Sequence, residues 1–227
     1  MRAIWQAGAK RPRIAVKVCG ITRQTDLMEA ARLGVDAIGL NFYPGSPRYI
    51  TPDQANELLE HWPNPVVAVG LLVKPDLEMV NSLVRSVPAL GWLQFHGVTE
   101  PPTWPAPRPW IAAFAPKSAI ELEGVSDWIT RAGQCPTPPS AVLVDGHSPG
   151  MEGGTGVTAP WHLLESFRPA IPWILAGGLR PENVIQAIHQ TQPDAIDLAS
   201  GVEEKPGIKS ARKISELMHA VSKAAGQ

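Results

Sequence analysis

Short apolar runs alternate with longer amphipathic stretches along most of the chain. Most of these runs stay apolar through several successive residues, which is typical of strands buried on both faces of a parallel sheet. We predict eight strands on this basis: IAVKV from Ile14, DAIGLNF from Asp36, PVVAVGLLV from Pro65, GWLQF from Gly91, PWIAAF from Pro109, AVLVD from Ala141, IPWILA from Ile171 and DAIDLA from Asp194.

Amphipathic stretches with helix start or stop signals separate most of the runs. In RQTDLMEAARLG, Leu27 and Ala30 belong to one apolar stripe, and Gly34 is a typical residue to end a helix. In TPDQANELLEHW, Thr51 suits the N-cap and Pro52 suits the first helical position. We also expect helices in KPDLEMVNSLVRS, APWHLLESF, RPENVIQAIHQ and GIKSARKISELMHAVSKA, whereas prolines and short polar segments blur the period of the fourth and fifth helices.

This alternation predicts an α/β protein in which residues 14–227 form a single-domain (β/α)8 TIM barrel, because eight strands and 227 residues are close to what that fold needs. A doubly wound parallel sheet is the competing fold, but VCGITRQ after the first strand lacks the GxGxxG fingerprint. Residues 1–13 are basic and lack an apolar core, so we expect a flexible N-terminal arm. The proline clusters at 101–110 and 135–140 are interpreted as rigid loops within one domain.

The charge balance and the cysteine content narrow the class of protein. Lys and Arg total 20 against 21 for Asp and Glu, which gives no electrostatic reason to expect a nucleic acid or an acidic membrane as partner. No run approaches the roughly 18 apolar residues of a membrane span, and none resembles a signal peptide. The two cysteines are far apart and show no zinc-ligand spacing with histidine. We therefore expect a cytoplasmic protein without a metal site.

The carboxyl ends of the last two strands carry a phosphate-binding pattern. In a barrel these ends face the active site. LAGGL places Gly177 and Gly178 after the seventh strand, and LASGVE places Ser200 and Gly201 after the eighth. Glycine lets a phosphate oxygen approach the backbone N–H groups closely, so we predict a phosphate site here.

Two titratable side chains close other strands, namely Cys19 on the first and Asp145 on the sixth. A buried free cysteine is usually inert, but a carboxylate that ends an apolar run must be solvated, paired or functional. Arg48, in YPGSPRYI, is either a surface arginine or a fork for a substrate carboxylate. Lys17 shares the strand face of Cys19, where it either tunes the thiol or packs against acidic partners.

Seven motifs occur in the order found in phosphoribosylanthranilate isomerases: KVCGIT, NFYPGSPRYI, GLLV, LQFHG, VDGHSPGMEGGTG, LAGGLRPENV and DLASGVEEKPGIK. The chain resembles that family from about Ile14 to its C-terminal helix. The resemblance implies an isomerase of tryptophan, and hence aromatic amino-acid, biosynthesis. It performs an Amadori rearrangement that converts N-(5-phosphoribosyl)anthranilate to 1-(2-carboxyphenylamino)-1-deoxyribulose 5-phosphate. It also implies a small phosphorylated substrate, no cofactor and no metal, and a monomer or homodimer.

The resemblance assigns roles to matching positions. Cys19 is implied as the general base that removes the proton from ribose C2, and Asp145 as the general acid that protonates the ring oxygen. Arg48 is implied to hold the anthranilate carboxylate. The remaining substrate-binding positions are Gly177, Gly178, Ser200 and Gly201 around the phosphate, Gly154 and Thr155 closing over the ligand, and Asp197 and His96 near the sugar.

Three alternatives remain open from the sequence. A histidine-pathway isomerase of an aminoaldose phosphate uses paired aspartates at the ends of strands one and five, whereas strand one here ends in Cys19. A non-catalytic sugar-phosphate-binding barrel has no need of an acid and a base together. Redox sensing through Cys19 requires a resolving cysteine, and none is near in sequence.

Overall fold

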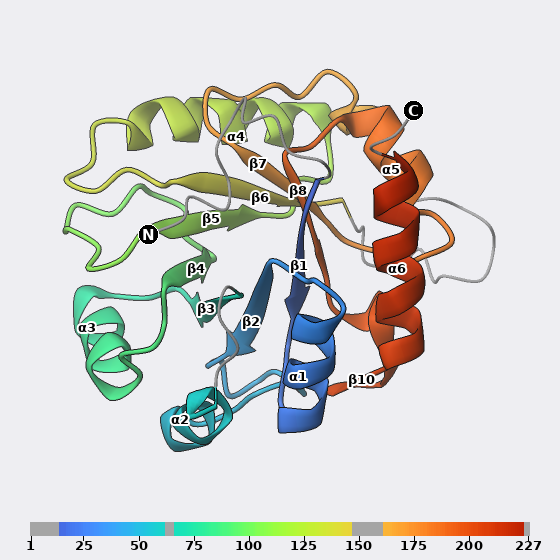
Figure 1. Ribbon diagram of the computed structural model, residues 1–227. Helices are drawn as coiled ribbons and strands as arrows, with labels where there is room; N and C mark the ends of the chain where they lie inside the picture. The colour runs from blue at the N-terminus through green and yellow to red at the C-terminus, as the bar shows by residue number, and fades with distance from the viewer. Residues whose placement is uncertain (1–13, 62–65, 147–160, 225–227) are drawn as a thin grey trace.

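Eight parallel strands close into a barrel in the computed structural model, which describes residues 14–61, 66–146 and 161–224 (Figure 1). The strands follow one another around the barrel in chain order, and each coincides with a predicted apolar run to within a residue at its C-terminal end. Their bounds are β1 (Ala15–Cys19), β2 (Ala37–Asn41), β3 (Val67–Val73), β4 (Trp92–His96), β5 (Trp110–Phe114), β6 (Ala141–Asp145), β7 (Trp173–Ala176) and β8 (Ala195–Leu198).

The first and last strands close the barrel. β1 pairs with β2 on one side and with β8 on the other, where Ala15 lies opposite Ala195 and Lys17 lies opposite Asp197. This closure confirms the predicted TIM-barrel class and excludes the doubly wound sheet. The N-terminal arm predicted for residues 1–13 lies outside the described residues.

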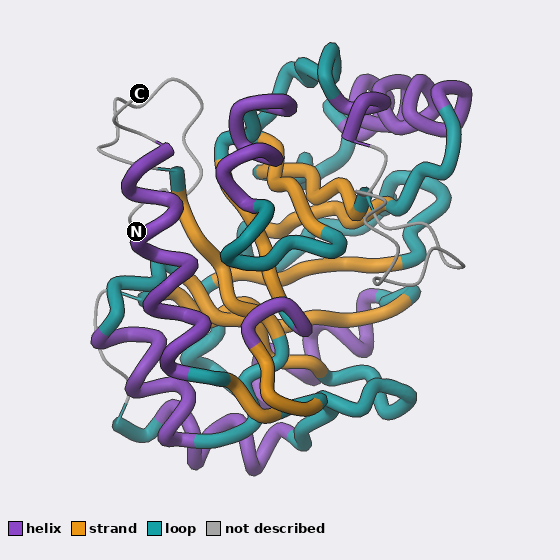
Figure 2. The backbone as a smooth tube through the Cα atoms, turned by 90° about the vertical axis from the view of Figure 1, so that its right-hand side faces the viewer, coloured by secondary structure: helices purple, strands orange, loops and turns teal. Residues whose placement is uncertain are grey.

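Helices surround the strands, as Figure 2 shows from a second direction. Local signals explain where several of them begin: Thr51 and Gln54 form a capping box on α2, while Asp76 and Ser118 accept hydrogen bonds from the first turns of α3 and α4. The helices are α1 (Gln24–Arg32), α2 (Pro52–Leu59), α3 (Leu77–Ser86), α4 (Ala119–Ala132), α5 (Val184–Thr191) and α6 (Ala211–Ala224). None of these helices is both long and apolar enough to cross a bilayer.

Two of the predicted helical segments differ in the structure, whereas residues 101–109 keep the loop that their proline cluster predicts. The described part of APWHLLESF, residues 161–167, forms only the 3-10 turn η1 (Trp161–Leu164). The segment before α6 forms the 3-10 turn η2 (Ser200–Val202) and a short antiparallel pair, β9 (Glu203–Lys205) and β10 (Ile208–Lys209). Residues 97–109, between β4 and β5, contain no helix. Five prolines in this connection lack the N–H donor that a continuing helix needs, which explains the irregular path.

Two separate apolar layers hold the fold together. Side chains that alternate outward from the strands, such as Val16 and Val18, pack against the helices. Inward side chains form a second cluster of mostly small residues, which includes Ala15, Ala37 and Ala195. Lys17 and Cys19 belong to the inward set, so a lysine and a thiol lie inside the barrel above this cluster.

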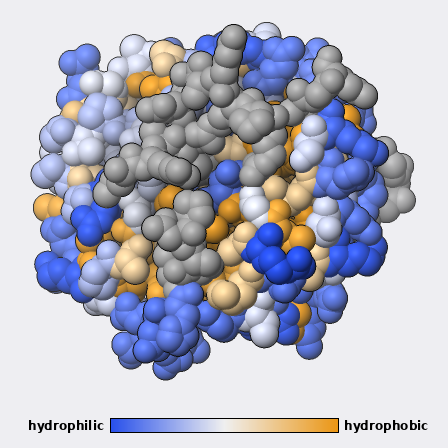
Figure 3. All heavy atoms as spheres, in the orientation of Figure 1, coloured by the Kyte–Doolittle hydropathy of each residue, from blue (hydrophilic) through white to orange (hydrophobic). Residues whose placement is uncertain are grey.

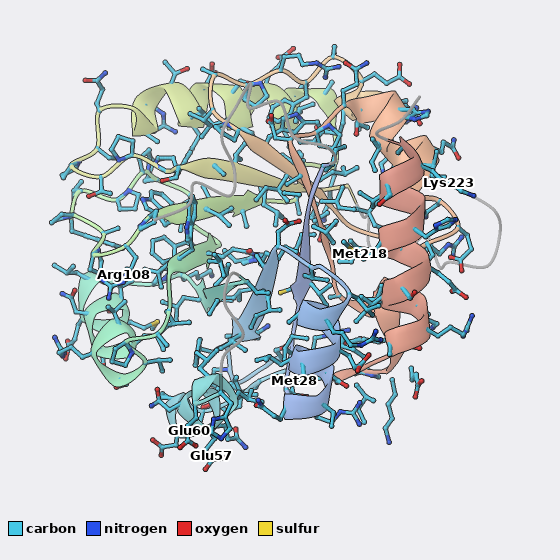
Figure 4. All side chains as sticks on the ribbon, viewed as in Figure 1. Met28, Glu57, Glu60, Arg108, Met218 and Lys223 are labelled. Carbon is cyan, nitrogen blue, oxygen red and sulfur yellow. The ribbon has the colours of Figure 1, made fainter. Side chains whose placement is uncertain are left out.

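The outer surfaces of the helices carry polar side chains together with a few exposed apolar ones, such as Met28 and Ile120. Glu57 on α2, Glu60 directly after α2 and Lys223 on α6 are exposed, whereas Met218 on α6 is buried (Figure 4). In the space-filling view, polar residues follow the edge of the molecule and apolar residues gather nearer the middle of the face shown (Figure 3).

Candidate functional site

A cavity of about 310 Å³ opens at the carboxyl ends of the strands. Its walls include nine of the residues predicted from the sequence: Cys19, Arg48, His96, Asp145, Gly177, Gly178, Asp197, Ser200 and Gly201. These nine positions therefore lie around one cavity, and their roles stay a prediction. Gly154 and Thr155 lie outside the described residues, and nothing is concluded about them.

Cys19 ends β1 and faces the cavity beside a buried ion pair. The Lys17 ammonium, fully buried, lies 2.9 Å from Asp197 Oδ2 on β8. Burial lowers the pKa of Lys17, but Asp197 and Cys19 raise it by more, so the amine stays protonated. Asp197 Oδ1 is buried and has no hydrogen-bond partner among the described residues, so this carboxylate keeps an acceptor for a ligand.

The thiol of Cys19 is held mainly in its neutral form. Burial raises its pKa, the Lys17 ammonium and the Lys209 ammonium lower it, and Asp197 raises it again, with a net rise above the ordinary value. A desolvated thiolate is therefore a minority species at neutral pH, but it is a stronger base than a solvated one once it forms.

Asp145 reaches the same cavity from the end of β6, which lies three strands from β1 around the barrel. The backbone on either side is fixed by the parallel register, with Asp145 opposite Ala176 and the Gly146 N–H donating to the Ala176 carbonyl at 2.9 Å. Asp145 and Cys19 thus stand on well-separated strands that face one space, which suits an acid and a base acting on different atoms of one ligand.

Arg48 enters the cavity on the β2–α2 loop and is fixed at both ends of its side chain. A Cβ on Gly20 would come within 2.3 Å of Arg48 Cδ, so the aliphatic stem passes through space that only glycine leaves open. The guanidinium donates to Glu203 from Nε at 2.8 Å and from Nη2 at 2.6 Å. Glu203 uses two of the five N–H donors, and three remain for a second partner.

Glu203 and Lys209 form a buried polar centre that the sequence analysis missed. Lys209 Nζ donates to Glu203 Oε1 at 2.7 Å and to the Cys19 carbonyl at 2.6 Å, and the Gly207 N–H donates to the same carboxylate oxygen at 3.1 Å. The motif DLASGVEEKPGIK contains both charges, but nothing in it distinguishes inward Glu203 from exposed Glu204. The structure shows that this centre ties the end of β1 to the chain after β8.

The predicted phosphate positions come together in two adjoining loops. Gly177 and Gly178 have φ of +90° and +62°, a conformation that glycine adopts without strain. A Cβ on Gly201 would lie 1.8 Å from the Leu179 carbonyl oxygen, so the loop after β8 packs directly against the loop after β7. This close backbone approach brings the two glycine-containing loops together at one wall of the cavity, and short backbone-rich loops of this kind are typical of phosphate sites.

His96 and Gln94 supply polar groups on β4. Burial, and secondarily the charge of Lys17, lowers the pKa of His96 to about 4, so the imidazole is neutral at physiological pH. Its Nε2 lies 2.7 Å from Gln94 Nε2, and we assign the amide as donor and the ring nitrogen as acceptor. His96 can therefore orient a ligand but is a poor proton donor near pH 7. Among the described residues, no cluster of three or more His, Cys, Asp or Glu side chains is arranged to hold a metal ion.

Comparison with known proteins gives a consistent result. A family model described as N-(5'phosphoribosyl)anthranilate (PRA) isomerase matches residues 16–220. The N-(5'-phosphoribosyl)anthranilate isomerase of Nitrosomonas eutropha is 41% identical over 210 residues, which cover 92% of this chain and 97% of the relative. That of Syntrophus aciditrophicus is 38% identical over 214 residues, which cover 93% and 88%.

Solved structures agree with the sequence relatives. Phosphoribosyl anthranilate isomerase from Thermotoga maritima superposes with a TM-score of 0.78 at 30% identity, over 92% of this chain and 99% of that one. The enzyme from Thermus thermophilus gives 0.76 at 35% identity, again over 92% and 99%. A further structure of such an isomerase, with a TM-score of 0.74 at 28% identity over 92% and 99%, contains reduced 1-(o-carboxyphenylamino)-1-deoxyribulose 5-phosphate.

Proposed function

The chain belongs to the N-(5'-phosphoribosyl)anthranilate isomerase family, and from that premise we propose that it converts N-(5-phosphoribosyl)anthranilate to 1-(2-carboxyphenylamino)-1-deoxyribulose 5-phosphate, with Cys19 as general base and Asp145 as general acid. The observation that carries this assignment is the placement of the thiol and the carboxylate at the ends of β1 and β6, on one cavity. A glycine-rich wall and Arg48 border the same space. These groups match the phosphate and the carboxylate at the two ends of the substrate.

The first proposed step opens the furanose ring. Asp145 protonates the ring oxygen as the bond from that oxygen to C1 breaks, and the lone pair of the anthranilate nitrogen forms the C1=N bond of an iminium ion. The cation that results withdraws electrons from C2. This makes the C2 proton far more acidic than it is in the starting sugar, so a modest base suffices for the next step.

In the second step the Cys19 thiolate removes the C2 proton. The C–H electrons form a C1=C2 bond, and the nitrogen takes back its electron pair to give an enol amine. Loss of the enol proton and protonation at C1 then give the ketose product, so no electron leaves the substrate. The raised pKa of the Cys19 thiol makes its thiolate a strong base, although only a fraction of the enzyme holds it at neutral pH.

The binding groups hold the substrate at both ends. Backbone N–H groups around Gly177, Gly178 and Gly201 are proposed to bind the phosphate, and the free edge of the Arg48 guanidinium to bind the anthranilate carboxylate. Asp197 Oδ1, buried and unpaired among the described residues, is placed to accept a hydrogen bond from a sugar hydroxyl. Anchoring both ends fixes C2 and the ring oxygen relative to the base and the acid.

Loss of substrate fluorescence provides the test. We expect Cys19→Ala, Cys19→Ser and Asp145→Asn each to lower turnover by about 10²–10⁴-fold while circular dichroism shows an intact fold. Cys135→Ser is the matched control, because Cys135 lies away from the cavity and should keep full activity. Near-normal turnover in a Cys19 or Asp145 variant contradicts the assigned roles. Absence of activity in the wild type favours a binding barrel or an isomerase of another aminoaldose phosphate, although β1 ends in Cys19 and β5 in Phe114 rather than in paired aspartates.

A further inference from the structure

Lys17 is an unusual residue for the interior of a barrel. Its side chain is fully buried, and the inward layer beneath it is apolar. A lysine in such a place must keep a counter-ion or lose its proton, and here Asp197 supplies the counter-ion at 2.9 Å. The pair is costly to bury, and well-packed apolar residues can often replace such a pair without loss of stability. Stability alone therefore does not account for a charge at this position.

The ammonium and the Cys19 thiol share one small space. Lys17 and Cys19 lie on the same face of β1, and Gly39 on β2 lies opposite Cys19 in the register. A Cβ built on Gly39 would lie 2.6 Å from Cys19 Sγ and 3.1 Å from Lys17 Nζ. Both atoms therefore reach the position that a side chain on β2 would fill, and the distance between them is at most the sum of the two values, 5.7 Å.

We propose that Lys17 is a positioning residue for the isomerisation: its ammonium, anchored by Asp197, stabilises and orients the Cys19 thiolate in the space that Gly39 leaves open. Cys19 as the base is part of the proposed function, and this inference rests on it. In the resting site the carboxylate of Asp197 balances the ammonium, so no net charge is buried. When Cys19 loses its proton, the ammonium lies within a short distance of the new anion in a poorly solvated site, where the attraction is strong.

Other charged groups near the thiol do not replace Lys17. Lys209 donates to the Cys19 carbonyl and is already paired with Glu203, and the Arg48 guanidinium is paired with the same carboxylate. Asp197 opposes the thiolate, and the carboxylate of Asp145 and the neutral imidazole of His96 line the cavity farther along. Among the cations, Lys17 lowers the pKa of the Cys19 thiol the most. Removing Lys17 should therefore raise the pKa of the Cys19 thiol more than removing any other nearby cation.

The test measures the thiol directly. In a Cys135→Ser background, the rate of Cys19 alkylation by iodoacetamide is followed against pH by mass spectrometry, for the parent and for Lys17→Met. We expect the midpoint to rise by about one pH unit or more, so that alkylation at neutral pH slows about tenfold. The limb of the pH profile of kcat/KM that reports the Cys19 thiol should move in the same direction. A purely structural role would lower thermal stability and leave the midpoint where it is.

A second variant protects the test against misfolding. Lys17→Met leaves Asp197 buried without its cation, which can prevent folding. The double variant Lys17→Met/Asp197→Asn removes both charges and should still show a raised midpoint, because the effect of Lys17 on the thiol exceeds that of Asp197. An unchanged midpoint in whichever variant folds overturns the proposal. Because alkylation needs no turnover, this result is independent of whether Cys19 proves to be the catalytic base.

Discussion

Arg48 and Glu203, 155 residues apart in the chain, form a two-point contact in which Nε and Nη2 of the guanidinium face the two carboxylate oxygens. The same carboxylate also accepts from Lys209, so one anion is shared by two cations next to the cavity. The three charged side chains carry a net positive charge, which a substrate carboxylate can balance. Glu203 thus joins the β2–α2 loop, the end of β1 and the chain after β8 in a single centre.

Replacing Glu203 should destabilise the protein in a pH-dependent way. Burial alone would raise the pKa of Glu203, but hydrogen bonds from Arg48 and Lys209 outweigh it and hold the pKa below its ordinary value. The carboxylate therefore contributes stability that is fully present above its unfolded-state pKa of about 4.3 and is lost as the pH falls through the lower folded-state pKa. We expect Glu203→Gln to lower the free energy of unfolding by about 3 kcal/mol at pH 7.

Urea unfolding at several pH values measures this effect. The difference between wild type and Glu203→Gln should be greatest near neutrality and should shrink as the pH falls below about 4. Glu204→Gln is the control, because Glu204 is the exposed neighbour and its replacement should change stability by less than about 0.5 kcal/mol. A constant difference at all pH values would show that the charge of Glu203 is unimportant.

Gly20→Ala should harm both stability and substrate binding, whereas Gly34→Ala should harm stability alone. Both glycines have a positive φ, +78° and +84°, where an alanine costs about 1–2 kcal/mol. A Cβ on Gly20 would also strike Arg48 Cδ, but a Cβ on Gly34 would meet only Met218 Cε at 3.9 Å. Steady-state kinetics and thermal unfolding should show a raised KM for Gly20→Ala only; equal KM values would refute a role for Gly20 in placing Arg48.

Gly201→Ala should weaken phosphate binding. The new methyl group cannot fit 1.8 Å from the Leu179 carbonyl oxygen, and because that neighbour is backbone, one of the two loops must move. We expect the inhibition constant for inorganic phosphate to rise about tenfold or more, which corresponds to the loss of one or more hydrogen bonds to a charged group.

Gly124→Ala in α4 is the matched control for that change. A Cβ at Gly124 meets no atom within 4 Å, so alanine should raise the free energy of unfolding by up to about 1 kcal/mol and leave phosphate inhibition unchanged. If phosphate inhibits Gly201→Ala as strongly as it inhibits the Gly124→Ala control, the loops after β7 and β8 do not form the proposed site.

The imidazole of His96 should titrate far below ordinary histidine. Its pKa of about 4 lies beneath the roughly 6.5 of the unfolded chain, so the unfolded state binds a proton first as the pH falls. Stability should therefore be lost between about pH 6.5 and pH 4, and this loss should be smaller in His96→Asn. Nuclear magnetic resonance of the imidazole checks the midpoint, and a value near 6.5 would mean that the ring is solvated.

The strands and the inward side chains were predictable because they depend on local pattern. In a run such as AVLVD, the change from apolar residues to a charged one indicates where the strand ends. The strand period of two places Lys17 and Cys19 on one side of β1. The barrel then brings all eight ends to one face, so the cavity wall follows from the strand ends alone. The family motifs added the roles, which the residue types alone left open.

The partners of the charged side chains were not predictable, because they depend on contacts between distant segments. The sequence placed Arg48 on a Pro-flanked loop but did not reveal its partner Glu203. It placed Lys17 on the face of Cys19 but revealed neither Asp197 nor the space beside Gly39. The helical period likewise failed for APWHLLESF, whose described residues 161–167 contain a short apolar run and form only one 3-10 turn. Local propensity decides such short segments less than their packing does.

The seam where β1 meets β8 has a consequence for synthesis. Lys17 and Asp197 face each other across it although 180 residues separate them, and Lys209 crosses it to reach the Cys19 carbonyl. A nascent chain that ends at β7 contains Cys19 and Asp145 but lacks Asp197, Glu203 and Lys209. Because chains emerge from the ribosome N-terminus first, the cavity gains its last wall only when the final strand has left the exit tunnel. A nascent chain therefore has a complete cavity only after β8 and the segment that carries Glu203 and Lys209 have emerged.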